Sequence, residues 1–364
     1  MKRTAAFRTI LPCVMLAHAS MASGQGGIAR VAPQYRPVGD VMFLGTRDLG
    51  QAAAGAGRLT AVAATQTRMP RIAPPRRPAG EVSFRSVLDL NQDVGASQPM
   101  LRGAMMIANS RDWQASLYTT FESAEGPASC TAALVGPQAV LTAAHCVPDS
   151  RRIQIEFTNR NYGAVCDVHP QYADQSDDSA DYALCRVDRP VAVPPDIQFE
   201  TINTGSINGL LGQRLVLGGY GCTSDLVREN EVDGQYRIGL NNVEETSNSP
   251  ARRYGDDLYS GREDNNLFTS DEPELANVCP GDSGGPAFEA RAGDDGLYGR
   301  RSIVGVNSRV FYRDFNDDGT PRSYGASLIS ATGGPDFRSW ALAWAARARV
   351  PVCGLVSGVP NCRN

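Results

Sequence analysis

Histidine is scarce in this sequence, with three residues in a chain of 364. Positive and negative charges are almost balanced, and a formal net charge of -4 provides no strong electrostatic attraction for nucleic acid. Beyond the N-terminus, no apolar run is long enough to span a bilayer. No two cysteines stand in a Cys-x-x-Cys pair, which argues against a zinc site. The sequence therefore disfavours a nucleic-acid-binding protein, a membrane-spanning protein and a zinc protein.

What the chain does contain is enough apolar sequence for a sizeable core, with a hydrophobic fraction of 42%. Its length fits one large domain with an extension. Many short apolar segments separated by turn signals, such as Ile153–Phe157 and Leu215–Gly221, predict an all-β barrel architecture. Near the end, Trp340 and Trp344 stand one helical turn apart, which predicts a C-terminal helix.

Residues 1–23 have the features of a secretory signal peptide. Lys2 and Arg3 supply a positive start, Ile10–Ala17 is a short apolar stretch, and Ala17–Ala19 matches an A-x-A cleavage site. An ordinary N-terminal helix is the alternative. Export would place the protein outside the cell or in the periplasm.

The cysteine count agrees with export. Of nine cysteines, Cys13 would leave with the signal peptide, and an even number would remain for disulfides in an oxidising compartment. These eight are Cys130, Cys146, Cys166, Cys185, Cys222, Cys279, Cys353 and Cys362.

Residues 24–102 differ in composition from the rest, being rich in Ala, Gly, Pro and Arg and free of cysteine. The Pro- and Arg-rich stretch 68–78 cannot form a helix or a central strand. We therefore expect a propeptide or a loosely ordered extension here, and a folded domain over residues 103–364. The alternative is an extension that packs permanently on the folded domain.

The stretch Cys279–Pro286, Cys-Pro-Gly-Asp-Ser-Gly-Gly-Pro, places a serine among glycines. Glycines allow backbone N–H groups to gather around one point, and a nucleophilic serine needs such a point to bind an oxyanion. The amides of Gly281 and Ser283 are the candidates for that oxyanion hole. A simple Gly/Pro/Asp/Ser turn is the alternative reading of the same residues.

A serine hydroxyl needs an imidazole to take its proton, and the imidazole needs a buried carboxylate. His145 lies in Leu141–Cys146, whereas His169 reads as part of a surface turn. Asp181 directly precedes an apolar segment that would bury it, while Asp177 and Asp178 lie in a polar run that reads as a solvated loop. The order in the chain is then His145, Asp181, Ser283.

These three motifs closely resemble those of the chymotrypsin/trypsin family of serine proteases, over about residues 104–348. The resemblance implies two six-stranded antiparallel β-barrels with a C-terminal helix. It suggests a secreted member of the bacterial type, made as a zymogen, and a catalytic triad of His145, Asp181 and Ser283. In the family, Asp282 receives a new N-terminus after activation. No Ile-Val-Gly-Gly start is visible here to supply one.

The same resemblance places Asn277 at the floor of the primary specificity pocket, where an Asp would select Arg or Lys. It places Ser308 and Val310 on the strand that lines the substrate cleft, with Val310 where an open pocket has glycine. We therefore expect cleavage after small or medium uncharged residues.

The resemblance also implies a Cys130–Cys146 disulfide. We further expect Cys353–Cys362 and Cys222–Cys279, which leaves Cys166–Cys185.

Two other segments bear on the prediction. The polar sequence between Cys222 and Cys279 reads as a long surface loop at the cleft rim. Asp314–Gly319 matches the start of a calcium-binding loop but lacks the expected Glu, since Gly325 stands at the twelfth position. A tight hairpin turn explains the same residues, and we favour it over a calcium site. We expect no cofactor and no metal.

The function expected is a secreted serine endopeptidase acting on protein or peptide substrates, with an oligomeric state that the sequence leaves open. A secreted esterase using the same triad is one alternative, and a non-catalytic, protease-like binding protein is another.

Overall fold

The computed structural model describes residues 75–86, 105–107, 112–124, 126–222, 224, 226–227, 233–254, 259–290 and 300–363. All of them belong to one compact unit, residues 66–364. The expected signal peptide and most of the expected extension lie outside the described residues.

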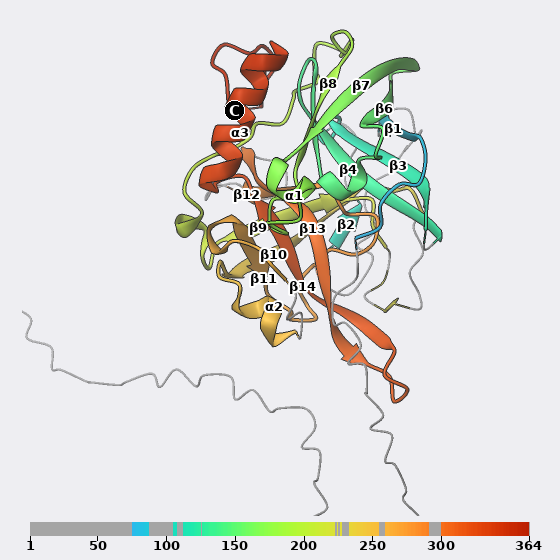
Figure 1. Cartoon of the computed structure of the whole chain (residues 1–364), viewed down its shortest axis with the longest axis vertical. Coiled ribbons are helices and arrows are strands. Elements are labelled where there is room, and N and C mark those ends of the chain that lie inside the picture. Colours follow the sequence, from blue (N-terminus) through green and yellow to red (C-terminus); the bar gives the residue numbers. More distant parts are fainter. Residues whose placement is uncertain are drawn as a thin grey trace, which may run out of the picture. The chain divides into compact units, whose positions relative to one another are not determined.

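The first half of the described chain forms a closed barrel of seven strands in the order β1-β3-β4-β5-β8-β7-β6 (Figure 1). All neighbours pair antiparallel except β1 and β6, which run parallel. The strands are β1 (Val82–Ser86), β3 (Ser116–Ser123), β4 (Gly126–Gly136), β5 (Ala139–Thr142), β6 (Arg152–Phe157), β7 (Arg160–Val168) and β8 (Ala183–Val187).

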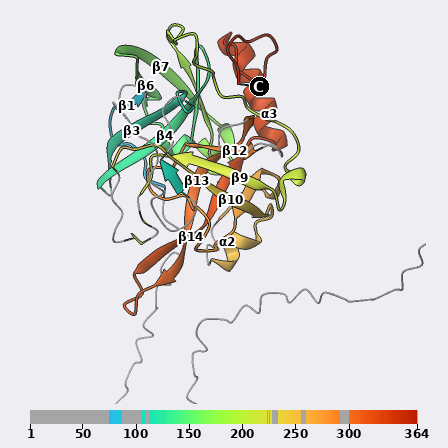
Figure 2. The ribbon, with the colours of Figure 1, turned by 180° about the vertical axis from the view of Figure 1, so that it is seen from behind.

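The second half forms a seven-stranded sheet in the order β11-β14-β13-β12-β9-β10-β2, seen from behind in Figure 2. An additional pairing of β10 with β11 closes six of these strands, and β2 continues the sheet beyond β10. The strands are β2 (Met105–Ile107), β9 (Arg214–Gly219), β10 (Arg237–Glu245), β11 (Asn266–Thr269), β12 (Pro286–Ala290), β13 (Arg301–Phe315) and β14 (Pro321–Ala331).

Helices are few and short in the described residues apart from the last. They are α1 (Pro170–Ala173), α2 (Ser249–Arg253) and α3 (Pro335–Ala348), with 3₁₀ turns η1 (Ala144–Cys146), η2 (Ile207–Leu210) and η4 (Glu263–Asn265). The face of α3 that carries Phe337, Ala341 and Trp344 is buried in the main hydrophobic core. No helix among the described residues is long and apolar enough to cross a membrane.

The predicted all-β fold of two barrels with a C-terminal helix is confirmed, with one strand more in the first barrel than expected. That strand is β1, inside the expected extension. Val82, Phe84 and Ser86 are fully buried while the residues between them are exposed, as a half-buried strand requires. The first barrel therefore begins well before residue 103, where the sequence analysis placed the start of the folded domain.

Two local expectations are also wrong. The segment between Cys222 and Cys279 is not one surface loop, because it contains β10 and β11, both strands of the second barrel. His169 is not at the surface: it is 3% exposed, and its ring packs against Tyr182 and Trp340.

All four expected disulfides are present: Cys130–Cys146, Cys166–Cys185, Cys222–Cys279 and Cys353–Cys362. Cys166 and Cys185 are direct partners on β7 and β8. Cys130–Cys146 ties η1 to β4, and Cys222–Cys279 ties the end of β9 to the segment before Ser283. The disulfides thus fasten both segments that carry the predicted site.

Candidate active site

Two hydrogen bonds join His145 and Asp181, both contributed by the first barrel and both buried. His145 lies in η1, directly after β5, and Asp181 lies just before β8, the strand that pairs with β5. The Nδ1 of His145 is 2.7 Å from Oδ2 of Asp181, and the backbone N–H of His145 donates to Oδ1 at 3.0 Å. The two side chains are 1% and 0% exposed.

Ser308, on β13 of the second barrel, donates its hydroxyl to Oδ2 of Asp181 at 2.6 Å. Burial alone would raise the pKa of Asp181, but His145, Ser308 and the cation of Arg309 together hold it below its usual value. The carboxylate therefore stays ionised, although no part of it meets solvent. Ser308, expected only as a cleft-lining residue, also helps to hold this buried charge.

Ser283 lies in the loop that precedes β12, and two glycines give this loop its shape. Gly281 and Gly284 have φ angles of +106° and +81°, which side chains disfavour. A Cβ on Gly284 would stand 2.2 Å from Oγ1 of Thr142 and 2.3 Å from the carbonyl oxygen of Thr131. These positions accept only glycine without a shift of the neighbouring strands.

The loop is fastened to the first barrel at Thr131 on β4. The N–H of Thr131 donates to the carbonyl of Ser283 at 2.7 Å, and its hydroxyl donates to the carbonyl of Gly281 at 2.8 Å. Within the described residues, the N–H groups of Gly281 and Ser283 have no backbone acceptor. Both amides predicted for the oxyanion hole are thus free of competing main-chain bonds.

Asp282 is turned inward, away from the cleft. Its Oδ1 accepts the N–H of Gly221 at 2.7 Å, and its Oδ2 accepts the N–H of Cys279 at 3.0 Å. Burial raises the pKa of Asp282 to about 6, against the opposing effect of these two amides and of Arg237. The carboxyl has two main-chain donors here, in a chain whose sequence shows no Ile-Val-Gly-Gly start to supply the new N-terminus that this Asp receives in the family.

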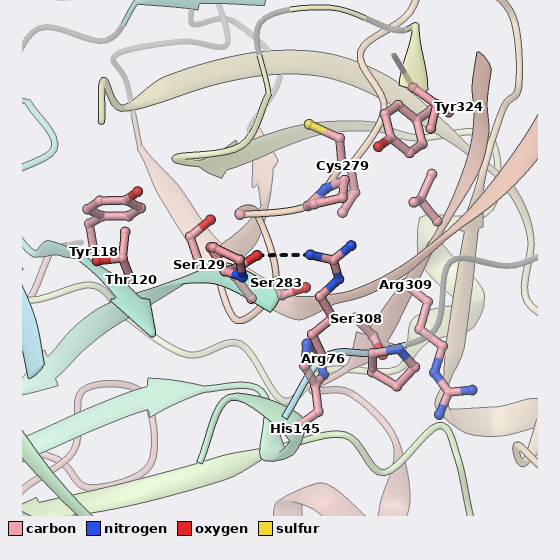
Figure 3. A pocket seen from close by; sticks show the side chains of 18 of the residues that line it. Arg76, Tyr118, Thr120, Ser129, His145, Cys279, Ser283, Ser308, Arg309 and Tyr324 are labelled. Atoms are coloured by element: carbon pink, nitrogen blue, oxygen red, sulfur yellow. Dashed lines mark hydrogen bonds between the residues drawn. The ribbon is translucent and has the colours of Figure 1, made fainter. Parts of the chain in front are cut away.

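Ser283, His145 and Ser308 line one cavity of about 520 Å³ (Figure 3). Its apolar part includes Val278, Val310 and Tyr324. Two predicted substrate-binding residues, Ser308 and Val310, therefore line the same cavity as Ser283.

Asn277, the third predicted substrate-binding residue, is absent from the residues that line this cavity. It lines a separate small cavity with Asp282 and Arg237, and its amide lies 3.1 Å from Nδ2 of Asn241. Asn277 therefore does not contribute to the wall of the cavity that Ser283 lines.

Comparison with known proteins agrees with this geometry. The model of the trypsin family, described as "Trypsin", matches residues 101–324, more than half of the chain. The chain belongs to the trypsin family.

Curated relatives are distant in sequence. Kallikrein-15 of Saguinus oedipus is 27% identical over 200 residues, which cover 51% of this chain and 75% of the relative. Serine protease SSP1 of Scolopendra subspinipes is 25% identical over 226 residues, which cover 58% of this chain and 73% of the relative.

The sequence analysis of this trypsin-family chain missed one ion pair beside the site, Arg309–Asp178. Arg309, next to Ser308, is buried to 9% exposure and its Nη2 is 2.8 Å from Oδ1 of Asp178. The other oxygen of Asp178 accepts the N–H and the hydroxyl of Ser260 at 3.0 Å each. Asp178 thus connects the first barrel to Arg309 on the second barrel and to Ser260 after α2. The local sequence could not predict this pairing, because the partners are far apart in the chain.

Asp177 has a similar role and is fully buried. Its Oδ1 accepts the N–H groups of Ser179 and Arg262, and its Oδ2 accepts the side-chain amide of Asn265 at 3.0 Å. The expectation of a solvated loop at Asp177 and Asp178 is therefore wrong. Both carboxylates fix the segment that leads into Asp181.

Metal ligation finds little support in the described residues. Their one group of three potential ligands is Cys130, His145 and Cys146, but the two cysteines are joined in a disulfide and offer no thiolate. The Asp314–Gly319 stretch runs from the last two residues of β13 into the turn that precedes β14. There Asp314 accepts the hydroxyl of Ser323, and Asp318 accepts the amide and hydroxyl of Thr320. These bonds are those of a hairpin turn, the alternative to calcium binding.

Proposed function

We propose that this chain is a secreted serine endopeptidase that hydrolyses peptide bonds through an acyl-enzyme. The observation that carries the proposal is the hydrogen bond of His145 to the buried Asp181, with His145 on the same cavity as Ser283 and the amides of Gly281 and Ser283 free of main-chain acceptors. Membership of the trypsin family and relatives named as proteases support it.

In the proposed reaction, His145 takes the proton of Ser283 as the hydroxyl attacks the carbonyl carbon of the substrate. The amides of Gly281 and Ser283 would then donate to the oxyanion of the tetrahedral intermediate. His145 would next protonate the leaving amine, which leaves the acyl group on Ser283. Water, deprotonated by His145, would release the acid in the same way.

Asp181 would fix the tautomer and orientation of His145. Its Oδ2 accepts from Nδ1 of the ring, so the proton stays on Nδ1 and the other ring nitrogen is left to act as base. Because Asp181 stays ionised, it also stabilises the imidazolium that forms during the reaction.

For specificity, we propose cleavage after small or medium uncharged residues. The cavity beside Ser283 carries Val278, Val310 and Tyr324, and none of the residues that line it is an Asp or Glu. A substrate Arg or Lys buried there would have no carboxylate to pair with, which costs binding free energy. The support thus comes from Val310 and Tyr324 rather than from Asn277.

Export remains part of the proposal. Four disulfides in the described residues suit an oxidising compartment, and the signal peptide predicted at residues 1–23 would direct the chain there. The bacterial-type membership expected from the sequence stays a prediction, since the relatives named above are animal proteins.

A substrate panel tests the proposed activity. Purified protein is given casein, a peptide library and p-nitrophenyl esters, with the Ser283→Ala variant as control. Cleavage of casein and peptides that is lost in the variant would support an endopeptidase. Turnover of esters alone would favour the esterase, and no turnover of any substrate would favour a protease-like binding protein.

A further inference from the structure

Arg76 brings a positive charge without a counter-ion to the wall of the candidate active-site cavity. The side chains with a permanent charge that line this cavity are Arg76 and Arg309, and none of the lining residues is an Asp or Glu. Arg309 is buried and paired with Asp178, which compensates its charge. Arg76 is exposed and forms no ion pair within the described residues, and its Nη1 donates to the carbonyl of Pro127 at 2.9 Å (Figure 3). Burial raises the pKa of Tyr312 and the cation of Arg76 opposes this effect, so the charge of Arg76 acts across the cavity.

The segment that carries Arg76 is held in place by the residues that follow it. Pro78 is buried and bridges to Ser123 at the end of β3, and the N–H of Ala79 donates to the carbonyl of Glu122 at 2.8 Å. Strand β1 comes next and is built into the barrel between β3 and β6. Arg76 is thus two residues from a fixed point, and a group that is already held in position loses less conformational freedom when it binds a ligand.

The position of Arg76 determines which part of a substrate it can meet. The apolar part of the cavity, with Val310 and Tyr324, comes from the second barrel and takes the residue before the scissile bond in the proposed specificity. Arg76 instead contacts the carbonyl of Pro127 on β4, in the first barrel. A substrate that fills the apolar part and crosses Ser283 therefore leaves along β4, beside Arg76.

The cavity is large enough for the scissile bond and its neighbours. A sphere with the cavity volume of about 520 Å³ is about 10 Å across, and an extended peptide advances about 3.3 Å per residue, so about three residues fit. A side chain one or two positions after the scissile bond therefore shares the cavity with Arg76. The guanidinium has N–H groups to spare beyond the one that Pro127 accepts, and carboxylates bind such groups through strong, charge-assisted hydrogen bonds.

We propose that Arg76 is a specificity-determining residue that selects peptides with Asp or Glu one or two positions after the scissile bond. The inference rests on the proposed endopeptidase function and adds a second element to its specificity. The preferred substrate then has a small or medium uncharged residue before the bond and an acidic residue after it. In the free protein, the carbonyl of Pro127 keeps the guanidinium at the cavity wall.

The test measures kcat/KM of the full chain, with Arg76 confirmed by intact mass, on peptides that differ in one residue. Glu, Gln or Lys is placed at each of the two positions after the scissile bond, and at the second position before it. The variants are Arg76→Ala and Arg76→Glu. Arg77→Ala is the matched control, because it loses the same charge one position away, at a residue absent from the cavity wall. Labelling of Ser283 by a small fluorophosphonate shows whether the active site of each variant is intact.

We expect the parent protein to prefer Glu over Gln by about tenfold in kcat/KM at one of the two positions after the bond. Arg77→Ala should keep this preference, and Arg76→Ala should reduce it to within twofold. Arg76→Glu should reverse it, so that the Lys peptide becomes the best of the three, because the sign of the charge in the cavity wall has changed.

Three results would overturn the inference and leave the endopeptidase proposal standing. The first is equal turnover of the Glu, Gln and Lys peptides by the parent protein, and the second is a preference for Glu confined to the position before the bond. The third is an equal rise for every peptide in Arg76→Ala, which would mean that Arg76 only obstructs the cavity. Absence of peptide cleavage and of Ser283 labelling in every form would overturn both proposals.

Discussion

Among single residues, Asp282 gives the clearest dependence on pH. Its pKa is about 6 in the folded chain, against an ordinary value of 3.8, so the folded state holds this proton more tightly than the unfolded state. The stability contributed by the protonated form is fully present below about pH 4. It is lost as the pH rises to about 6 and beyond, when the buried carboxyl must ionise.

Asp282→Asn removes that titration. We predict that the free energy of unfolding of the parent protein, minus that of the variant, falls by about 2–3 kcal/mol between pH 4 and pH 7. This size corresponds to the difference of about two pKa units between folded and unfolded Asp282. Urea unfolding of both proteins at the two pH values, in a Ser283→Ala background that prevents self-digestion, measures it. A difference that stays constant or grows with pH would contradict the account.

The proposed triad makes a second prediction for single residues. Ser283→Ala, His145→Ala and Asp181→Asn should each lower kcat by several orders of magnitude, because the three groups act as a unit. Asp196→Asn, an exposed carboxylate in the loop after β8, is the control and should leave kcat unchanged. Peptide turnover decides, and full activity in Asp181→Asn would show that the His145–Asp181 contact is only structural.

Val310 makes a third prediction. It is 3% exposed and packs in one cluster with Tyr324, so its removal should enlarge the apolar part of the cavity. Val310→Gly should raise kcat/KM for peptides with a large apolar residue before the scissile bond, by about 10-fold relative to those with alanine. A panel of peptides that differ only at this residue measures it. A tenfold preference of the parent protein for Arg or Lys would refute the proposed specificity.

Strand β1 is the element that most changes the expected domain organisation. Phe84 is fully buried in the first barrel, whereas its neighbour Arg85 is exposed and pairs with Glu156 at the surface. Phe84→Ala should destabilise the folded chain by about 3–5 kcal/mol, and Arg85→Ala by no more than about 1 kcal/mol. Denaturant unfolding in the Ser283→Ala background compares them. Equal, small effects would mean that β1 is dispensable, as the sequence first suggested.

The sequence was sufficient to predict features that depend on short local motifs. The loops around His145 and Ser283 each carry a distinctive run of residues, and the apolar segment after Asp181 is the reason for its burial. The disulfides followed from the family pattern for Cys130–Cys146 and from elimination for Cys166–Cys185. Each of these rests on residues that are close together in the chain or on one recognisable pattern.

Features that depend on contacts between distant segments were missed. Val82–Ser86 does alternate between apolar and polar residues, but the Pro- and Arg-rich sequence before it hid the signal. The Arg309–Asp178 ion pair joins residues from the two barrels, and no local sequence pattern predicts it. Asn277 was placed by counting back from Ser283, and counting cannot show that its side chain turns toward Asn241.

In the molecule as a whole, the candidate site exists only where the two barrels meet. His145 and Asp181 belong to the first barrel, while Ser283 and Ser308 belong to the second. The contacts that join them are the Ser308–Asp181 and Arg309–Asp178 pairs and the Thr131 bonds to the Ser283 loop. A buried ion pair between Glu200 and Arg301, with Arg301 stacked 3.7 Å over the ring of Trp113, adds a further link.

The central claim is that Ser283 is a nucleophile activated by this assembly, and a fluorophosphonate that carries a mass tag tests it most directly. The protein is labelled, digested and mapped by mass spectrometry, in parallel with Ser283→Ala, His145→Ala and a urea-unfolded sample. We predict one tag per chain, on Ser283, with none in Ser283→Ala or the unfolded chain and labelling slowed by at least a hundredfold in His145→Ala. A tag on another serine, or equal labelling of Ser283 without His145, would contradict the account.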